Sequence, residues 1–188
     1  MTGFLDDYSG PFVPDFSHEK LSREALLRIL KANSVYLRRL DATWYQTVMK
    51  KRGNDLAFEC DSEIWGKFIN YELDVLCRTL NIRGNDIEAV IKAIQATPWM
   101  RMHNRTFEMT EKNRAVVTFR NCRTLLNLEK ESTRRYEQIC HVLERRLFEL
   151  TAEYFNPNIK VNALKLPPRE EGSDVCCRWE FKMNGEKP

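Results

Sequence analysis

The chain has 188 residues, of which 43% are hydrophobic and 30% are charged. A chain of this length and composition buries a sizeable core as one globular domain. The 30 basic and 27 acidic residues are interspersed and give a net charge of +3. This balance lacks the basic stripe of nucleic-acid-binding proteins, and no apolar run approaches the roughly 18 residues that cross a bilayer. We therefore expect a cytoplasmic protein with no nucleic-acid or membrane partner.

Residues 1–98 indicate an aromatic arm followed by three helices. Aromatic residues alternate with glycine and proline over residues 1–20, which predicts an irregular arm pinned to the body. The predicted helices cover residues 22–52, 61–81 (with Asp61 or Ser62 as its N-cap) and 85–97. Ser22 is a competent N-cap for the first helix and Gly53 stops it. Asn85 with Glu88 forms a capping box for the third helix, which Pro98 ends.

After residue 98 the hydrophobic period changes from that of a helix to that of a strand. Strands are predicted over residues 106–110, 114–121, 159–166 and 175–183, with a long helix over 132–154 and a short helical turn near 124–130. The fold class is therefore α+β, in which long N-terminal helices pack with a C-terminal ββαββ unit that forms an antiparallel sheet. We expect the regions 1–98 and 99–188 to form one continuous domain.

Six cysteines are many for a chain of this kind, and none forms a Cys-x-x-Cys pair. Cys122 follows a predicted strand, Cys140 lies on the apolar stripe of a helix, and Cys177 faces inward from the last strand. If these three thiols meet, they form a reactive cluster or a zinc or iron site with one open position for water. The alternative is a sulfur-rich core, because free cysteine packs as a small hydrophobic residue. The spacing leaves both alternatives open.

Asp41 and Glu72 each interrupt an apolar seam of a predicted helix. A carboxylate in such a seam is costly unless it finds a partner. The structural interpretation is an ion pair with a nearby arginine, or a hydrogen bond from a ring such as that of Trp44. The catalytic interpretation is a pocket between two antiparallel helices in which one carboxylate acts as a general acid or base. In that pocket Trp44 would be a substrate contact.

Arginines near the predicted start of the 132–154 helix suggest a clamp for a carboxylate on a small-molecule ligand. Arg123 and Arg169 are the candidates for bidentate contacts, and Arg169 stands on the loop that begins with Pro167 and Pro168. The alternative is that these side chains pair with glutamates of the same region. No serine-hydrolase, zincin or nucleotide-binding motif is present.

Several short motifs resemble a family of small, mostly uncharacterised proteins of anaerobes that is related to the L-2-amino-thiazoline-4-carboxylic acid hydrolase-like group. The matching pieces include Tyr8-Ser9-Gly10-Pro11-Phe12, Asp41-x-x-Trp44-Tyr45, Asn81-Ile82-x-Gly84-Asn85-Asp86, Phe155-Asn156-Pro157 and Cys177-x-Trp179-Glu180-Phe181. The family often has Cys-Pro-Thr where this chain has Cys122-Arg123-Thr124. It also has a glycine-rich stretch that is replaced here from Glu131 onward, which puts a glycine-dependent ligand loop in doubt.

Two hypotheses follow from the residues and the resemblance. The first is a hydrolase-like enzyme that acts on a small polar or sulfur-containing molecule, with Cys122, Cys140 and Cys177 as its reactive or metal-binding cluster. The second is a non-catalytic module that senses a metal, a ligand or redox state through the same cluster. The long amphipathic first helix is a candidate homodimer interface.

Overall fold

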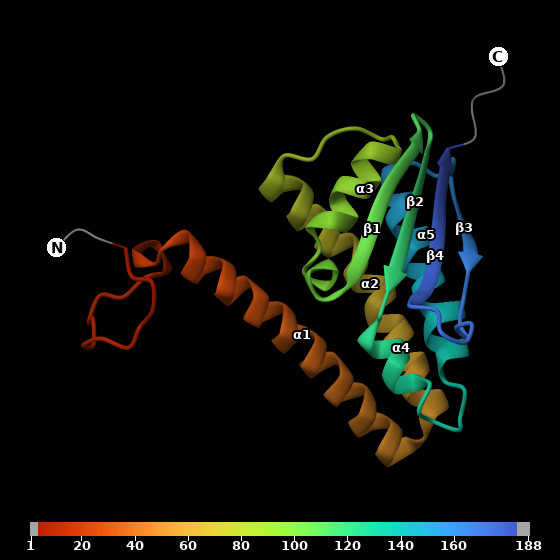
Figure 1. Cartoon of the computed structure of the whole chain (residues 1–188), viewed down its shortest axis with the longest axis horizontal. Helices are drawn as coiled ribbons and strands as arrows, with labels where there is room; N and C mark the ends of the chain where they lie inside the picture. The colour runs from red at the N-terminus through yellow and green to blue at the C-terminus, as the bar shows by residue number, and fades with distance from the viewer. Residues whose placement is uncertain (1–3, 184–188) are drawn as a thin grey trace.

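The computed structural model describes residues 4–183 and has an α+β architecture (Figure 1). In chain order the elements are η1 (His18–Lys20), α1 (Arg23–Arg52), α2 (Asn54–Leu80), α3 (Ile87–Ala96), η2 (Pro98–Met102), β1 (Asn104–Glu111), β2 (Arg114–Arg120), α4 (Arg123–Leu128), the π-helical segment η3 (Glu137–Leu143), α5 (Glu144–Phe155), β3 (Ile159–Lys165) and β4 (Val175–Met183). Long helices thus precede a ββαββ unit, which confirms the predicted fold class. No helix in this described part is long and apolar enough to cross a membrane.

The four strands form one antiparallel sheet in the order β1-β2-β4-β3. The first two strands form the predicted hairpin, and β4 inserts between β2 and β3. Because side chains alternate along a strand, Trp179 and Phe181 of β4 point to the face that the helices cover, and both are fully buried. The sheet is therefore one wall of the core.

Helix α1 has the boundaries that its sequence predicts. The Ser22 hydroxyl accepts a hydrogen bond from the Ala25 backbone N–H, and the chain leaves the helix at Gly53 with a positive φ of 91°. The C-terminal half of α1 packs against α2, whereas its N-terminal half projects away from the body (Figure 1).

Helix α2 begins seven residues earlier than predicted. A new helix starts at Asn54, directly after the Gly53 turn, so Asp61 and Ser62 lie inside the helix and are not caps. The helix continues unbroken through these positions, because an aspartate in its interior costs only a few tenths of a kcal/mol. This difference turns Asp61 inward, where it is 5% exposed.

Helix α3 is capped one residue later than predicted, because the Asp86 carboxylate accepts the hydrogen bond from the Ala89 backbone N–H. The predicted helix over residues 132–154 begins only at Glu137, and its first seven residues have π-helical geometry. The wider π turn changes which side chains face inward in front of α5. The predicted short turn is α4.

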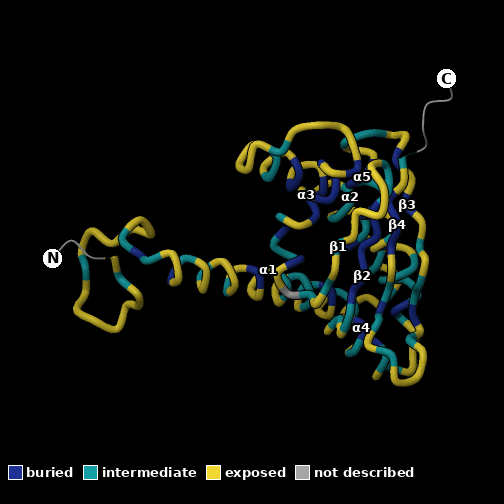
Figure 2. The backbone as a smooth tube through the Cα atoms, turned by 45° about the horizontal axis from the view of Figure 1, so that its top comes forward, coloured by how far each residue is buried: buried dark blue, intermediate teal, exposed yellow. Residues whose placement is uncertain are grey.

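The main core lies between α3, α5 and the inner face of the sheet, where Figure 2 shows the most continuous burial. It contains Ile87, Val90, Ile91, Ile94, Val117, Phe119, Phe148, Ala152, Trp179 and Phe181. A second cluster beneath α4 contains Leu125, Leu128, Tyr136 and Cys176, with Cys122 and Cys140 at its edge. These two clusters leave a space between them and the N-terminal helix pair.

The aromatic arm does not pin itself to the body as predicted. It folds back on the start of α1, where Leu5 and Leu21 form a β-bridge and the Ser22 N–H donates to the Leu5 carbonyl. Phe4 and Phe12 remain 73% and 81% exposed, at the far end of the projecting helix (Figure 1). The arm packs on the projecting end of α1, which lies away from the rest of the body (Figure 1).

Candidate functional site

A cavity of about 300 Å³ lies between the two long helices, α4, α5 and the inner end of β4. Most of its wall is apolar or aromatic, including Trp65, Trp99 and Phe148. This volume is at the lower end of the range for small-molecule pockets, which are mostly apolar with a few polar groups. The cavity is therefore the first place to look for chemistry.

Four carboxyl groups line this cavity: Asp41 of α1, Asp61 and Glu72 of α2, and Glu144 of α5, named here the carboxylate cluster. Within the described residues, none of the four forms an ion pair with lysine, arginine or histidine. Unpaired carboxylates in an apolar site are expensive, so they take up protons. The structure thus brings together Asp41 and Glu72, the two acids that interrupt the predicted seams, and adds two more.

Asp41 and Asp61 form the part of the cluster between α1 and α2. The Trp65 indole N–H lies beside both and donates to Asp41 at 3.3 Å. Burial raises the pKa of Asp61 to about 7, helped by the negative charge of Asp41, and burial also raises the pKa of Asp41. A single N–H cannot satisfy the acceptor positions of two carboxylates, so Asp41 and Asp61 together have fewer hydrogen-bond donors than they can accept.

Glu72 occupies the wall nearest η2. Its Oε1 accepts a hydrogen bond from the Trp99 indole N–H at 2.9 Å, and its side chain is largely buried. Burial raises the pKa of Glu72 to about 7 in spite of that donor. A single neutral hydrogen bond does not offset the loss of hydration that an ionised carboxylate suffers there.

Glu144 enters the cavity at the junction of η3 and α5. It is more exposed to solvent than the other three acids, yet the density of the surrounding protein raises its pKa to about 7. The charges of Asp41 and Asp61 add to this effect. Three acids from three helices are therefore coupled in their titration, and their apparent pKa values belong to the group.

The aromatic wall is built by rings from both long helices and η2. The Trp65 and Trp99 rings meet edge to face with centroids 4.8 Å apart. Tyr45 of α1 lies beneath the Arg135 guanidinium, at 5.3 Å from ring centroid to Cζ. Arg135 is held in turn by two hydrogen bonds of 2.6 Å to Glu131. This arginine is thus occupied, although it borders the cavity.

Cys122, Cys140 and Cys177 do meet, and all three border the cavity together with Cys176. Burial raises the pKa of each of these thiols, so they stay protonated at neutral pH. Among the described residues, no group of three or more His, Cys, Asp or Glu side chains is arranged to hold a metal ion. The predicted zinc or iron site therefore gains no support, and the three half-buried cysteines pack at the edges of the apolar clusters.

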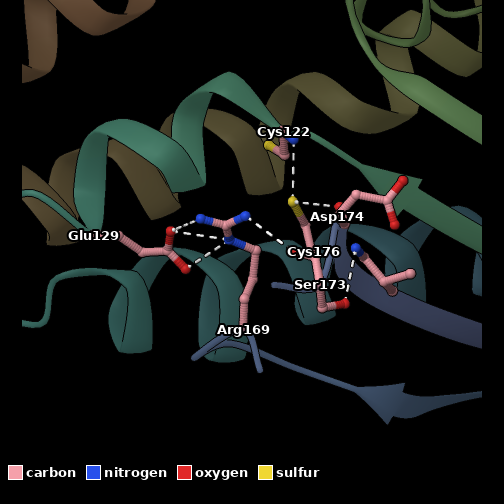
Figure 3. A network of polar contacts seen from close by, with 7 residues as sticks. Cys122, Glu129, Arg169, Ser173, Asp174 and Cys176 are labelled. Atoms are coloured by element: carbon pink, nitrogen blue, oxygen red, sulfur yellow. Dashed lines mark hydrogen bonds and ion pairs between the residues drawn. The ribbon is translucent and has the colours of Figure 1, made fainter. Parts of the chain in front are cut away.

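Figure 3 shows why one of the candidate residues, Arg169, serves the structure. Arg169 makes bidentate contacts to Glu129 at 2.7–3.0 Å and donates to the Ser173 carbonyl at 3.1 Å. The Cys176 sulfur accepts the Cys122 backbone N–H at 3.1 Å. Arg169 therefore fastens the loop before β4 to α4, outside the cavity, and its guanidinium is not free to clamp a ligand.

The other two predicted substrate contacts also lie elsewhere. Arg123 is exposed on α4, and neither it nor the half-buried Trp44 lines the cavity. Trp65 and Trp99 take the place that the sequence assigned to Trp44. Two polar atoms at the cavity wall, His103 Nδ1 and Trp179 Nε1, make no hydrogen bond of ordinary geometry within the described chain. The Trp179 N–H lies beside the Cys177 thiol, which is a weak acceptor.

Sequence reasoning missed Asp61 and Glu144 for different reasons. Asp61 resembles a helix cap, and only the early start of α2 turns it inward. Glu144 did carry a signal, because it follows Cys140 by four residues and precedes Leu147 by three on the same apolar stripe. An acid at that spacing marks an inward carboxyl group in the same way as Asp41 and Glu72.

Comparison with known proteins gives one result. The profile of a family described as "Family of unknown function (DUF6125)" matches residues 19–183. The search of curated proteins and the search of solved structures returned no match. The family match gives no link to the thiazoline-carboxylate hydrolase-like group that the motifs resemble.

Proposed function

Since the chain belongs to DUF6125, a family of unknown function, its activity has to be inferred from its own site, and we propose that it binds a small organic molecule in the cavity and acts on it by acid–base chemistry. The observation that carries this proposal is the carboxylate cluster, which projects into an apolar cavity of about 300 Å³ without ion-pair partners among the described residues. Apolar side chains at these positions would give a more stable core. The presence of four carboxyl groups in an apolar cavity therefore favours a function over a structural role.

The protonation state of the cluster suits general acid–base catalysis. A catalytic acid or base works best when its pKa lies near the working pH. Burial raises the pKa of Asp61, Glu72 and Glu144 to about 7 each. Each group is then partly protonated at neutral pH and can give or take a proton. A hydrolase-like reaction needs both abilities in one site.

The thiols that border the cavity do not serve as the nucleophile in this proposal. A thiolate, not a thiol, attacks carbon. Burial raises the pKa of Cys140 and Cys177, and the Glu144 carboxylate beside them adds to that rise. Water activated by a carboxylate is the nucleophile that these side chains favour.

A second candidate is binding without catalysis, as in a ligand-sensing module. The absence of a poised thiolate and of a metal-binding group among the described residues favours it, because both are common sources of catalytic power. Binding in the cavity is common to both candidates and is tested first.

The test is a thermal-shift screen of a small-molecule library against the wild type and two matched variants. Ala42 lines the cavity, so Ala42→Phe fills part of it, whereas the adjacent Thr43 is exposed and Thr43→Phe is the control. We expect ligands that stabilise the wild type and Thr43→Phe but not Ala42→Phe. Failure of every compound to stabilise the wild type, or equal stabilisation of Ala42→Phe, would overturn the proposal.

A further inference from the structure

We propose that the ligand of the cavity is a small organic cation, a protonated amine or amidine, held by the carboxylate cluster against the indole rings. This inference rests on the proposed function and names the chemical class of its ligand. It starts from a geometric fact: carboxyl groups from α1, α2 and α5 line one cavity and, within residues 4–183, form no ion pair with a cationic side chain.

The charges that face the cavity leave an excess of acid. Of the basic side chains on its wall, Arg135 is neutralised by its two hydrogen bonds to Glu131. His103 stays neutral because burial lowers its pKa, with the charges of Arg105 and Arg38 adding to the effect. Arg38 is then the one free cation at the wall of the described structure. One positive charge faces four acids, so an incoming cation corrects the imbalance and an incoming anion worsens it.

The best-placed acid has acceptor positions to spare. Asp61 is 95% buried, faces the cavity and accepts no hydrogen bond of ordinary geometry from the described residues. The Trp65 N–H beside it donates to Asp41 instead. A buried carboxylate short of hydrogen-bond donors is the complement of a group with several N–H bonds, such as an ammonium or amidinium.

The aromatic rings supply the second half of a cation site. Trp65 and Trp99 stand edge to face at 4.8 Å, and Tyr45 lies on the opposite helix. Indole faces attract cations by their quadrupole, with about 2 kcal/mol gained where water is excluded. Acids together with rings select an organic cation, because the apolar walls favour carbon over a hydrated inorganic ion.

The site requires that protons leave as the cation enters. The carboxyl groups are partly protonated in the empty cavity at neutral pH, and a bound cation favours their ionised form. Affinity for a cation therefore rises as pH rises from about 6 to about 8, by roughly tenfold for one acid that titrates near 7. A neutral ligand of the same shape shows no such rise.

The experiment is isothermal titration calorimetry with matched probes at about pH 6 and pH 8. Benzylamine and benzamidine are the cations, benzyl alcohol and benzamide their neutral counterparts, and benzoate the anion. We expect tighter binding of the cations, an increase near tenfold with pH, and release of protons in buffers of different ionisation enthalpy. Asp61→Asn should remove most of this preference, whereas Glu59→Gln, an exposed acid on the same helix, should retain it.

The outcomes separate this inference from the proposed function. If benzyl alcohol, benzamide or benzoate binds as tightly as the cations, the ligand class is wrong and the cavity is still a binding site. If, in addition, the thermal-shift screen finds no compound that stabilises the wild type but not Ala42→Phe, the proposed function is wrong as well. The pH dependence of the wild type tests the inference even where Asp61→Asn does not fold.

A separate observation concerns the projecting half of α1, where the structure assigns a docking surface for a second copy of this chain. Leu27, Leu30, Leu37 and Leu40 are 41–70% exposed along one side of the helix, and Arg28 and Arg39 lie on the opposite side. Together with the exposed Phe4 and Phe12 of the arm, these leucines present on the order of 800 Å² of apolar surface, which is what a standard stable interface buries per partner.

The same side of α1 continues into the body, where Trp44 and Val48 are half-buried. The apolar side of α1 is covered in its C-terminal half and exposed in its N-terminal half, so the N-terminal half lacks a packing partner. A two-fold pairing of α1 with α1 supplies one, because each copy then offers the same surface that it receives.

Multi-angle light scattering on the full chain tests this pairing. We expect the mass of two chains for the wild type and of one chain for the double variant Leu30→Glu/Leu37→Glu. Arg39→Glu, on the opposite side of the same helix, should remain a dimer. A wild type with the mass of one chain at high concentration, or a double variant that still dimerises, would overturn the proposal.

Discussion

Replacing Glu72 by glutamine should stabilise the protein at alkaline pH and leave it nearly unchanged in acid. Glutamine has the shape of glutamate and keeps an oxygen to accept the 2.9 Å hydrogen bond from the Trp99 ring. It removes only the ability to ionise. The variant therefore isolates the free energy that burial of this one carboxyl group costs.

The magnitude follows from the pKa of Glu72, which burial raises from 4.5 to about 7. The folded state binds this proton more tightly than the unfolded state, so the group favours folding below about pH 4.5 and that contribution is lost as pH rises to about 7. At 1.36 kcal/mol for each pKa unit, the loss is about 3 kcal/mol. In a domain of this size it corresponds to a difference of about 10 °C in melting temperature.

The assay is urea unfolding of the wild type and Glu72→Gln between about pH 4.5 and pH 8. Urea is preferred to guanidinium because a guanidinium ion is itself a small organic cation. We expect the two proteins to differ by about 3 kcal/mol more at the alkaline end than at the acid end. The exposed Glu59→Gln of the same helix should follow the wild type throughout.

A constant difference between Glu72→Gln and the wild type across this range would refute the reasoning. It would mean that Glu72 is ionised in the folded protein, and that a cation or water compensates it. The general acid–base proposal would then lose one of its groups.

Three further predictions concern the neighbouring side chains. The thiols of Cys140 and Cys177 should react with a disulfide reagent at neutral pH only after unfolding, because burial raises the pKa of both; rapid reaction of the native protein would contradict this. Arg169→Ala should lower stability by about 1–2 kcal/mol at pH 7 without altering cavity ligands. The loss should fade in acid, because the guanidinium lowers the pKa of Glu129, and urea unfolding at both pH values checks it. Trp99→Phe should weaken cation binding severalfold in calorimetry, because a phenyl face attracts a cation less strongly than an indole face, and unchanged affinity would remove the indole from the site.

Local signals in the sequence determined most elements of the fold. Ser22 and Gly53 set the ends of α1 because capping and a positive φ depend only on adjacent residues. The turn after Glu111 set the hairpin in the same way. The alternation along residues 175–183 assigned Trp179 and Phe181 to the inner side of the sheet, since strand geometry alone dictates it.

Asp41 and Glu72 were also visible, because a charged residue in an apolar seam stands out against the helical period. That both would line one cavity was not visible. It depends on how α1 and α2 turn about their axes when they pack, and that is decided by the sum of many side-chain contacts.

The tertiary structure alone decided the composition of the site. Asp61 changed from a cap to an inward carboxyl group when α2 began at Asn54, and Glu144 entered at the π-helical junction. Cys122, Cys140 and Cys177 line one cavity, and burial raises the pKa of each thiol. Their spacing in the sequence reveals neither fact. The sequence by itself determined which segments are helix or strand and which side of each is apolar, because these follow from neighbouring residues. The four acids of the cavity are spread over 103 positions of the chain, from Asp41 to Glu144, and only packing in three dimensions brings such groups together.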